Sequence, residues 1–238
     1  VEAMKAVFAV RDALVGDPAA MTVRPEALLA PSFARELAAG IDPKRAGPAR
    51  PLVRPPSGGT VYVAAADASG MMVSFISSVY MHFGSGVVAG DTGVLLQNRG
   101  AGFRLEPGRP QTLAPGRRPL HTIIPGLGDR PGELRACLGV TGADVQPQGQ
   151  GQIIMDLLRF GMTAQEALEA PRFRVDADGR VTVEDGIGPE ARQGLADRGH
   201  PVSVDDPLGF GAAQLVVRDL WSGVLTGATE SRRDAAVT

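Results

Sequence analysis

RPPSGGTVYVAAADASGMMVSFIS, residues 54–77, is the stretch where the sequence pattern changes, and this change decides the fold. Proline and glycine dominate from residue 42 to residue 59, which predicts an exposed, extended linker. The runs 60–66 and 72–77 are short and apolar, and the turn-forming residues 67–70 between them predict a β-hairpin. The chain is therefore expected to leave an irregular linker and to enter a sheet at Thr60.

Upstream of the linker, residues 1–41 have a helical pattern. Met4 and Phe8 belong to an apolar set with helical spacing, which predicts a helix that ends near residue 15. Two shorter helices are expected at 25–29 and 32–40. The chain starts inside this pattern and without a methionine, so we expect it to be a fragment or a processed chain of a longer protein.

Downstream of the hairpin, strands occur on both sides of a central block of helices. A capping box of Thr163 and Glu166 predicts the start of the second helix of this block. The order of elements favours an α+β fold over a doubly wound parallel sheet. The expected strands are 93–96, 121–125, 134–140, 173–175, 181–184, 214–218 and 223–226, and the expected helices are 148–160, 163–169 and 189–198.

The composition excludes several classes of function. The 24 basic and 26 acidic residues nearly balance, so neither a nucleic-acid partner nor a polybasic membrane surface is expected. Cys137 is the only cysteine and the three histidines are scattered, so no metal site is expected. The glycine-rich segments lack the Lys-Ser/Thr pair of a phosphate-binding loop, and no cofactor is expected. No apolar run has the length of a membrane span. The cellular location stays open, because any signal peptide would lie upstream of Val1.

Thr60 follows a glycine at the junction between linker and strand. A threonine hydroxyl is a weak nucleophile that needs a nearby base. Cleavage of the Gly59–Thr60 bond would make the α-amine of Thr60 that base, because an α-amine with a pKa of about 7.7–8 is partly neutral at physiological pH. Gly59 leaves its carbonyl open to attack by the Thr60 hydroxyl, which would start an N-to-O acyl shift. The alternative interpretation is a simple turn that leads into a strand.

Several stretches with specific sequences follow the hairpin in a fixed order. They are FGSGVVAGDTGVLLQNRGAGF (83–103), LAPGRRPLHTIIP (113–125), GVTGADVQPQG (139–149), FGMTAQEALEAPRFR (160–174) and GATESRRDAA (227–236). With these stretches, residues 60–238 resemble the small subunit of the γ-glutamyltransferase (γ-glutamyltranspeptidase) family of N-terminal-nucleophile (Ntn) hydrolases. The RDALVGDP and IDPKRA stretches of residues 1–41 resemble the end of the family's large subunit.

The resemblance implies a division of the chain and a reaction. Residues 1–59 correspond to the end of the large subunit plus the linker, and residues 60–238 correspond to the small-subunit catalytic domain. The implied fold is a four-layer αββα sandwich that is incomplete at the N-terminus, with the missing large-subunit portion as its partner. The implied activity is autocatalytic cleavage before Thr60, followed by hydrolysis or transfer of an acyl group from a small-molecule amide through an acyl-enzyme.

The resemblance also assigns the catalytic residues. Thr60 matches the nucleophile, and Ser78 falls where the family has a threonine that hydrogen-bonds the nucleophile. Gly142 and Ala143 match two glycines whose backbone N–H groups form the oxyanion hole. A donor of this kind contributes about 3–4 kcal/mol to the stability of the transition state, so the geometry of these N–H groups matters more than their side chains.

The substrate pocket departs from the family pattern. Tyr80, Arg99 and Gly102 stand where family members that act on glutathione hold the α-amino end of the donor. A carboxylate is absent at Gly102 and a cation is added at Arg99, which favours an anionic or neutral group over an ammonium. His121 and Thr122 fall on a pair of serines that contact the α-carboxylate of the substrate.

Three functions remain open at this point. The first is a γ-glutamyltransferase-like amidohydrolase, which would connect the chain to glutathione metabolism. The second is an acylase for glutaryl or cephalosporin-type side chains, because the QNRGAGF and DVQPQG sequences resemble the cephalosporin-acylase-like branch of the family. The third is an inactive, unprocessed fragment, because part of the pocket would lie upstream of Val1.

Four other residues are expected to be structural. His82 is interpreted as a loop residue and His200 as a surface turn residue, while Cys137 is expected to be a core thiol. Asp144 is expected to cap the helix that begins near residue 148.

Overall fold

The computed structural model describes residues 1–48 and 59–238. The fold is α+β, as the order of elements predicted. Its helices are α1 (Glu2–Leu14), α2 (Pro25–Leu28), α3 (Pro31–Ala39), α4 (Val145–Leu158), α5 (Ala164–Glu169) and α6 (Pro189–Asp197), with short 3₁₀ turns η1 (Pro18–Ala20), η2 (Arg99–Gly102) and η3 (Pro207–Phe210). Its strands are β1 (Thr60–Ala66), β2 (Met72–Ser78), β3 (Gly126–Arg130), β4 (Leu134–Val140), β5 (Phe173–Val175), β6 (Val181–Val183), β7 (Val202–Val204), β8 (Ala213–Asp219) and β9 (Leu225–Thr229).

The strands form three sheets. The largest is antiparallel throughout and has the order β3-β4-β8-β9. The predicted hairpin is confirmed as the antiparallel pair β1-β2, in which Thr60 faces Ser78 at the open end. A small third sheet has the order β5-β6-β7, and its last two strands are parallel. The strands β3 and β7 were not predicted. The sequence of β3 contains two glycines and two charged residues, so it shows no apolar pattern.

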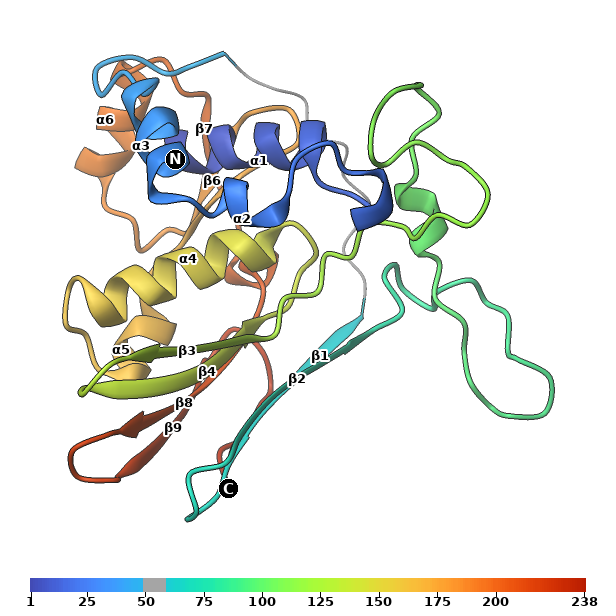
Figure 1. Ribbon diagram of the computed structural model, residues 1–238. Coiled ribbons are helices and arrows are strands. Elements are labelled where there is room, and N and C mark those ends of the chain that lie inside the picture. Colours follow the sequence, from blue (N-terminus) through green and yellow to red (C-terminus); the bar gives the residue numbers. More distant parts are fainter. Residues whose placement is uncertain (49–58) are drawn as a thin grey trace.

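The layers follow from the two-sided burial of β4. Helices α4 and α5 cover one face of the four-stranded sheet, and the β1-β2 hairpin lies against the other face (Figure 1). Val140 points toward the helices, where it contacts Gly149 of α4. Gly139, one residue earlier, faces the hairpin, and a side chain there would collide with the ring of Tyr62. Cys137 is fully buried in this strand, which confirms it as a core thiol.

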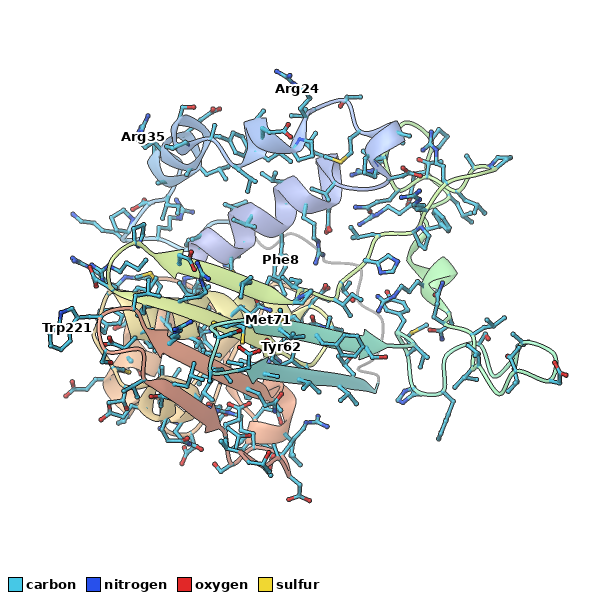
Figure 2. The ribbon with its side chains drawn as sticks, turned by 60° about the horizontal axis from the view of Figure 1, so that its bottom comes forward. Phe8, Arg24, Arg35, Tyr62, Met71 and Trp221 are labelled. Atoms are coloured by element: carbon cyan, nitrogen blue, oxygen red, sulfur yellow. The ribbon has the colours of Figure 1, made fainter. Side chains whose placement is uncertain are left out.

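Helix α1 lies on the outer side of α4, away from the sheet (Figure 1). Met4 approaches Gly151 of α4 closely, and Phe8 is 1% exposed and points from α1 into the interior (Figure 2). The other side of α1 contacts the segment after α6, where the ammonium of Lys5 donates to Nδ1 of His200 over 3.1 Å. The interpretation of His200 as a surface residue is therefore wrong, because the imidazole is buried against α1.

Two predicted strands are wrong. Residues 121–125 form no strand, because side chains of α4 satisfy the backbone there: the Ile124 N–H donates to Oε1 of Gln146, and the Ile124 carbonyl accepts from Gln150. Residues 93–96 contribute only an isolated bridge between Val88 and Leu95. The glycines of that loop allow tight turns in place of a continuous ladder.

Helix α4 begins three residues before the predicted start, at Val145. Glutamine side chains of this helix form hydrogen bonds with the backbone outside the helix. Gln148 exchanges two hydrogen bonds with Val175 of β5, and Gln152, one turn later, does the same with Phe173. The helix therefore connects the large sheet to the small sheet. Three of its glutamines, Gln146, Gln148 and Gln150, are buried, and Gln152 is half-buried.

Candidate active site

Thr60 and Ser78 form a hydroxyl pair at the open end of the hairpin. The two residues are cross-strand partners, and Oγ1 of Thr60 donates to Oγ of Ser78 over 3.1 Å. The backbone N–H of Tyr80 donates to the same Ser78 oxygen over 3.0 Å. The pairing of β1 with β2 thus brings together two residues that are 18 positions apart in the sequence. Gly59, the residue on the other side of the predicted junction, is exposed.

After β2 the chain makes an unusual turn at Tyr80. Its φ is 81°, a left-handed conformation that is costly for a bulky residue. The turn is held on both sides, because the N–H of Met81 donates to Oδ1 of Asn98 and the N–H of Asn98 donates to the carbonyl of Val79. These bonds place η2, which begins at Arg99, beside the end of β2.

Gly142 and Ala143 follow the end of β4, and both have positive φ, 109° and 52°. The preceding residue, Thr141, is joined to Ala212 in both directions: its N–H donates to the Ala212 carbonyl over 2.8 Å, and the Ala212 N–H donates to its Oγ1 over 3.0 Å. These two hydrogen bonds fix the start of the turn at Gly142. Thr60 and Thr141 line the same groove of about 820 Å³ beside β1.

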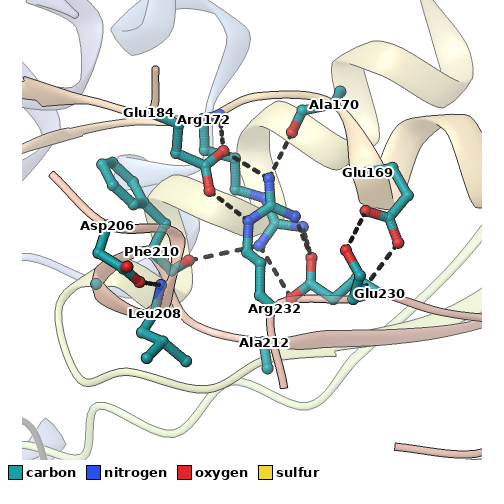
Figure 3. Close-up of polar contacts among 12 residues, drawn as sticks. Glu169, Ala170, Arg172, Glu184, Asp206, Leu208, Phe210, Ala212, Glu230 and Arg232 are labelled. Atoms are coloured by element: carbon teal, nitrogen blue, oxygen red, sulfur yellow. Dashed lines mark hydrogen bonds and ion pairs between the residues drawn. The ribbon is translucent and has the colours of Figure 1, made fainter. Parts of the chain in front are cut away.

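A buried ion network supports the segment that contacts Thr141 (Figure 3). Glu230 has a fully buried side chain and accepts hydrogen bonds from Arg172, from Arg232 and from the N–H of Ala213. Glu184 balances the second arginine, because Nε and Nη2 of Arg232 donate to its carboxylate. The network carries two positive and two negative charges, so these buried groups are paired as buried ions require.

A smaller pocket of about 160 Å³ lies beside Tyr80. Tyr80, Gly102 and Thr122 of the predicted substrate-binding residues line it, so these three residues, far apart in the sequence, come together. The other lining residues are Arg11, Asp12, Met81, Ala101, Arg104, Gln111, Leu120 and Asp144. Burial, together with the nearby carboxylate of Asp144, raises the pKa of the Tyr80 phenol, which therefore stays protonated.

Arg99 is buried next to this pocket, and 1% of its surface is exposed. Its guanidinium stacks over the ring of Tyr80 at 5.1 Å, and its Nη1 donates to Oγ1 of Thr122 over 3.3 Å. Its buried Nη2 has no hydrogen-bond partner among the residues that the structure describes. Burial lowers the pKa of Arg99, which reflects a cation that lacks compensation. Arg99 itself does not line the pocket, but the two residues that its guanidinium contacts, Tyr80 and Thr122, do.

The histidines differ in their surroundings. The side chain of His121 reaches solvent, and partial desolvation together with the charge of Arg99 lowers the pKa of its imidazole, which favours the neutral form at pH 7. His82 is exposed and has a positive φ of 40°, as expected for a loop residue, and its carbonyl lies near Gly59. Neither side chain donates to Thr60 in the structure's hydrogen bonds, so the hydroxyl of Ser78 is its observed partner.

Sequence reasoning missed the contribution of α1 to this region. Arg11 lines the small pocket, and its Nη1 donates to Oδ1 of Asp144 over 2.7 Å. The expectation that Asp144 caps α4 is therefore wrong: Asp144 occupies the N-cap position, but its side chain accepts no capping hydrogen bond. The RDALVGDP sequence, which begins at Arg11, contributed to the family resemblance. No pattern within it predicts that Arg11 contacts residue 144.

Comparison with known proteins decides the family. The whole chain, residues 1–238, matches the sequence profile of the family described as Gamma-glutamyltranspeptidase. The chain belongs to the gamma-glutamyltranspeptidase family. Its membership makes it a chain of an Ntn-hydrolase proenzyme family, in agreement with the resemblance found in the sequence.

Three relatives within the gamma-glutamyltranspeptidase family show the branch. The chain is 40% identical to the glutathione hydrolase-like YwrD proenzyme of Bacillus subtilis and 37% identical to the oxamate amidohydrolase proenzyme of Klebsiella pneumoniae, in each case over 99% of this chain and 46% of the relative. The crystal structure of cephalosporin acylase from Bacillus halodurans superposes with a TM-score of 0.86 and 41% identity, over 98% of this chain and 43% of that one. The chain thus spans less than half the length of these family members.

Proposed function

We propose that this chain belongs to a self-cleaving amidohydrolase in which Thr60 is the nucleophile, released by cleavage of the Gly59–Thr60 bond. The observation that carries the proposal is the hydroxyl pair of Thr60 and Ser78 at the open end of the hairpin. A rigid strand pair positions the nucleophile better than a loop would. Membership of a proenzyme family supports the same assignment.

The reaction follows from the free amine that cleavage would create. The neutral α-amine of Thr60 takes the proton of its own hydroxyl, and Oγ1 attacks the carbonyl carbon of a bound amide. The tetrahedral intermediate collapses, the C–N bond breaks, and the leaving amine takes the proton from the α-ammonium. A water molecule then attacks the acyl ester with the same base, which releases the carboxylic acid and restores the hydroxyl. An amine in place of water would give acyl transfer.

The proposed oxyanion donors are the backbone N–H groups of Gly142 and Ala143. Their positive φ values turn successive N–H groups toward one side, as in an anion-binding nest. Thr141 fixes the start of this turn through its two hydrogen bonds with Ala212. Donors that are held in place before reaction stabilise the developing oxyanion without reorganisation.

The proposed acyl group carries a negative charge at its far end. The orphan Nη2 of Arg99 is a buried donor that a carboxylate would satisfy, and Thr122 offers a hydroxyl beside it. Gly102 provides no carboxylate for an ammonium. An acylase for glutaryl-type amides is therefore favoured over a glutathione hydrolase. The relative named for oxamate supports an anionic substrate, because oxamate is an amide that carries a carboxylate.

We also propose that the rest of the protein completes a four-layer αββα sandwich, divided at residue 59 into a large-subunit part and a small-subunit part. The outer face of the hairpin supports this proposal, because it is apolar and exposed. Val61 and Val63 of β1 and Val73 and Phe75 of β2 share that face. An apolar face of this kind needs a further layer. The alternative, an inactive fragment, applies if residues 1–238 are made alone.

The proposal is tested on the complete gene product. Intact mass and denaturing electrophoresis should detect a new chain that begins at Thr60, and Thr60→Ala should stay full length and inactive. Turnover of a glutaryl anilide should equal or exceed turnover of the γ-glutamyl anilide. An active, unprocessed Thr60→Ala protein would contradict the nucleophile, and a strong preference for the γ-glutamyl anilide would contradict only the acyl specificity.

A further inference from the structure

We propose that Arg11 is a positioning residue for the amidohydrolase reaction: from the far side of the cleavage junction, it neutralises Asp144 beside the oxyanion donors. The inference rests on the proposed function and deepens it. It assigns to the segment before residue 59 a role in the catalytic step. Its basis is the close ion pair between a helix that precedes the junction and the residue that follows Ala143.

Several contacts hold the guanidinium of Arg11 in place beside Asp144. Nη1 of Arg11 lies 2.7 Å from Oδ1 of Asp144, while Nε and Nη2 of the same guanidinium contact Oδ1 of Asp12 at 2.9 and 2.8 Å. The guanidinium also packs over the ring of Phe8 at 4.5 Å. The side-chain amide of Gln111 donates to the carbonyl of Arg11, which holds the end of α1 in place. Arg11 is therefore pre-positioned by its own helix and by the loop that faces it.

Asp144 depends on this partner. Its side chain is only 5% exposed and caps no helix N–H. Among the described residues, the ion pair with Arg11 is the one that its carboxylate makes. An uncompensated carboxylate in such a place is costly, and the side chain would move toward solvent. This movement would disturb the backbone at Ala143, the adjacent residue.

The charge of Asp144 also matters for the reaction itself. Negative charge develops on the substrate oxygen near the N–H groups of Gly142 and Ala143, so a bare carboxylate one residue away would oppose it. Coulomb interactions are strong where water is largely excluded. Arg11 reduces this repulsion, while Arg104 lies 3.7 Å from Oδ2 of Asp12, the other carboxylate that Arg11 contacts. The effect of Arg11 is expected in the chemical step more than in substrate binding.

The test compares Arg11→Met, Asp144→Asn and the double variant in the complete gene product. Arg11→Met should lower kcat about tenfold or more while KM changes less than about threefold, because the lost interaction acts in the transition state. In the double variant, removal of the carboxylate should restore kcat to within about threefold of Asp144→Asn. A wild-type kcat in Arg11→Met, or no recovery in the double variant, would overturn the inference.

Two controls separate this role from simple anchoring of α1. Arg109 is an exposed residue that donates to the Asp12 carbonyl over 3.3 Å and has no bond to Asp144. Arg109→Met should therefore leave kcat unchanged, and equal losses in both arginine variants would contradict the charge argument. The melting temperature of each variant shows whether α1 stays docked. Thr60→Ala tests the proposed function independently, because it should lose self-cleavage and activity while the ion pair of Arg11 with Asp144 is kept.

Discussion

Oγ1 of Thr60 lies 3.1 Å from Oγ of Ser78 and donates to it across the β1-β2 pair. Ser78 also accepts from the N–H of Tyr80, so the position of its oxygen is fixed by a second bond. The orientation of the proposed nucleophile is therefore set by the register of a hairpin and by the turn at Tyr80. Both features are local, and both can be tested by small changes.

Ser78→Ala should lower kcat about tenfold, because the Thr60 hydroxyl loses its observed partner and samples other rotamers. Ser78→Thr is the matched control, since it keeps the hydroxyl and adds only a methyl group, and it should retain most activity. The measurement is turnover of a chromogenic anilide by fully cleaved protein. Equal activity in the alanine and threonine variants would show that the Ser78 oxygen has no role.

Arg99→Met should raise KM for a glutaryl anilide about tenfold or more, because a charge-assisted hydrogen bond to the acyl carboxylate would be lost. KM for an acyl anilide without a charged end should change little. Arg99→Lys keeps the positive charge but loses the planar guanidinium, and its KM for the glutaryl anilide should lie between those of the wild type and Arg99→Met. A uniform rise in KM for charged and uncharged acyl groups would indicate general damage to the pocket.

Ala143→Gly should leave the protein equally stable or raise its free energy of unfolding by up to about 1 kcal/mol. Ala143 has φ of 52°, a conformation that is strained for alanine and free for glycine, while glycine also adds entropy to the unfolded chain. Urea denaturation measures the difference. A loss larger than about 1 kcal/mol would mean that the Ala143 methyl group has packing contacts that outweigh the strain.

Glu230→Gln should lower the free energy of unfolding by about 3–5 kcal/mol, because it leaves two buried arginines with a single carboxylate partner. The change should also weaken the bond to the Ala213 N–H, and through Ala212 the support of Thr141. Asp129→Asn is the control, since Asp129 pairs with Arg135 on the surface and its loss should have no measurable effect on the melting temperature.

Stability should decrease as pH falls below about 6.5, with a contribution from His200. Burial and the charge of Lys5 lower the pKa of this imidazole, and Arg198 acts in the same direction while Glu2 opposes it. As pH falls, His200 therefore takes up a proton in the unfolded state before it does so in the folded state. The free energy of unfolding is unaffected by this residue above about pH 6.5 and decreases on acidification. Melting temperatures between about pH 5 and pH 8 should show a shallower slope for His200→Gln.

Much of the fold could be predicted from the sequence, because the spacing of apolar residues indicates most of the long strands and helices. The apolar runs that became β1, β2, β4 and β8 are long enough to show a pattern, and the capping box of Thr163 and Glu166 is confirmed at the start of α5. Residues 121–125 look like a strand but bond to glutamine side chains of α4. No local pattern contains that information, because the partners are more than 20 residues away.

The candidate site was predictable only where motifs were specific. The resemblance assigned Tyr80, Gly102 and Thr122 to the substrate, and these three residues line one pocket. The same pocket contains Arg11, whose role depends on where α1 packs. The orphan donor of Arg99 likewise depends on burial, which a sequence does not give.

Helix α1 and the loop after it are bound to the rest of the chain by polar contacts. They include Arg11 to Asp144, Gln111 to the carbonyl of Val15, and the N–H of Arg118 to Asp17. In the precursor these contacts form within one chain, at the high effective concentration that a covalent connection provides. After cleavage at residue 59, the same contacts would have to form between two molecules. Recovery of the cleaved enzyme from denaturant should therefore be second order and slow at high dilution, whereas the precursor folds at a rate that is independent of its concentration.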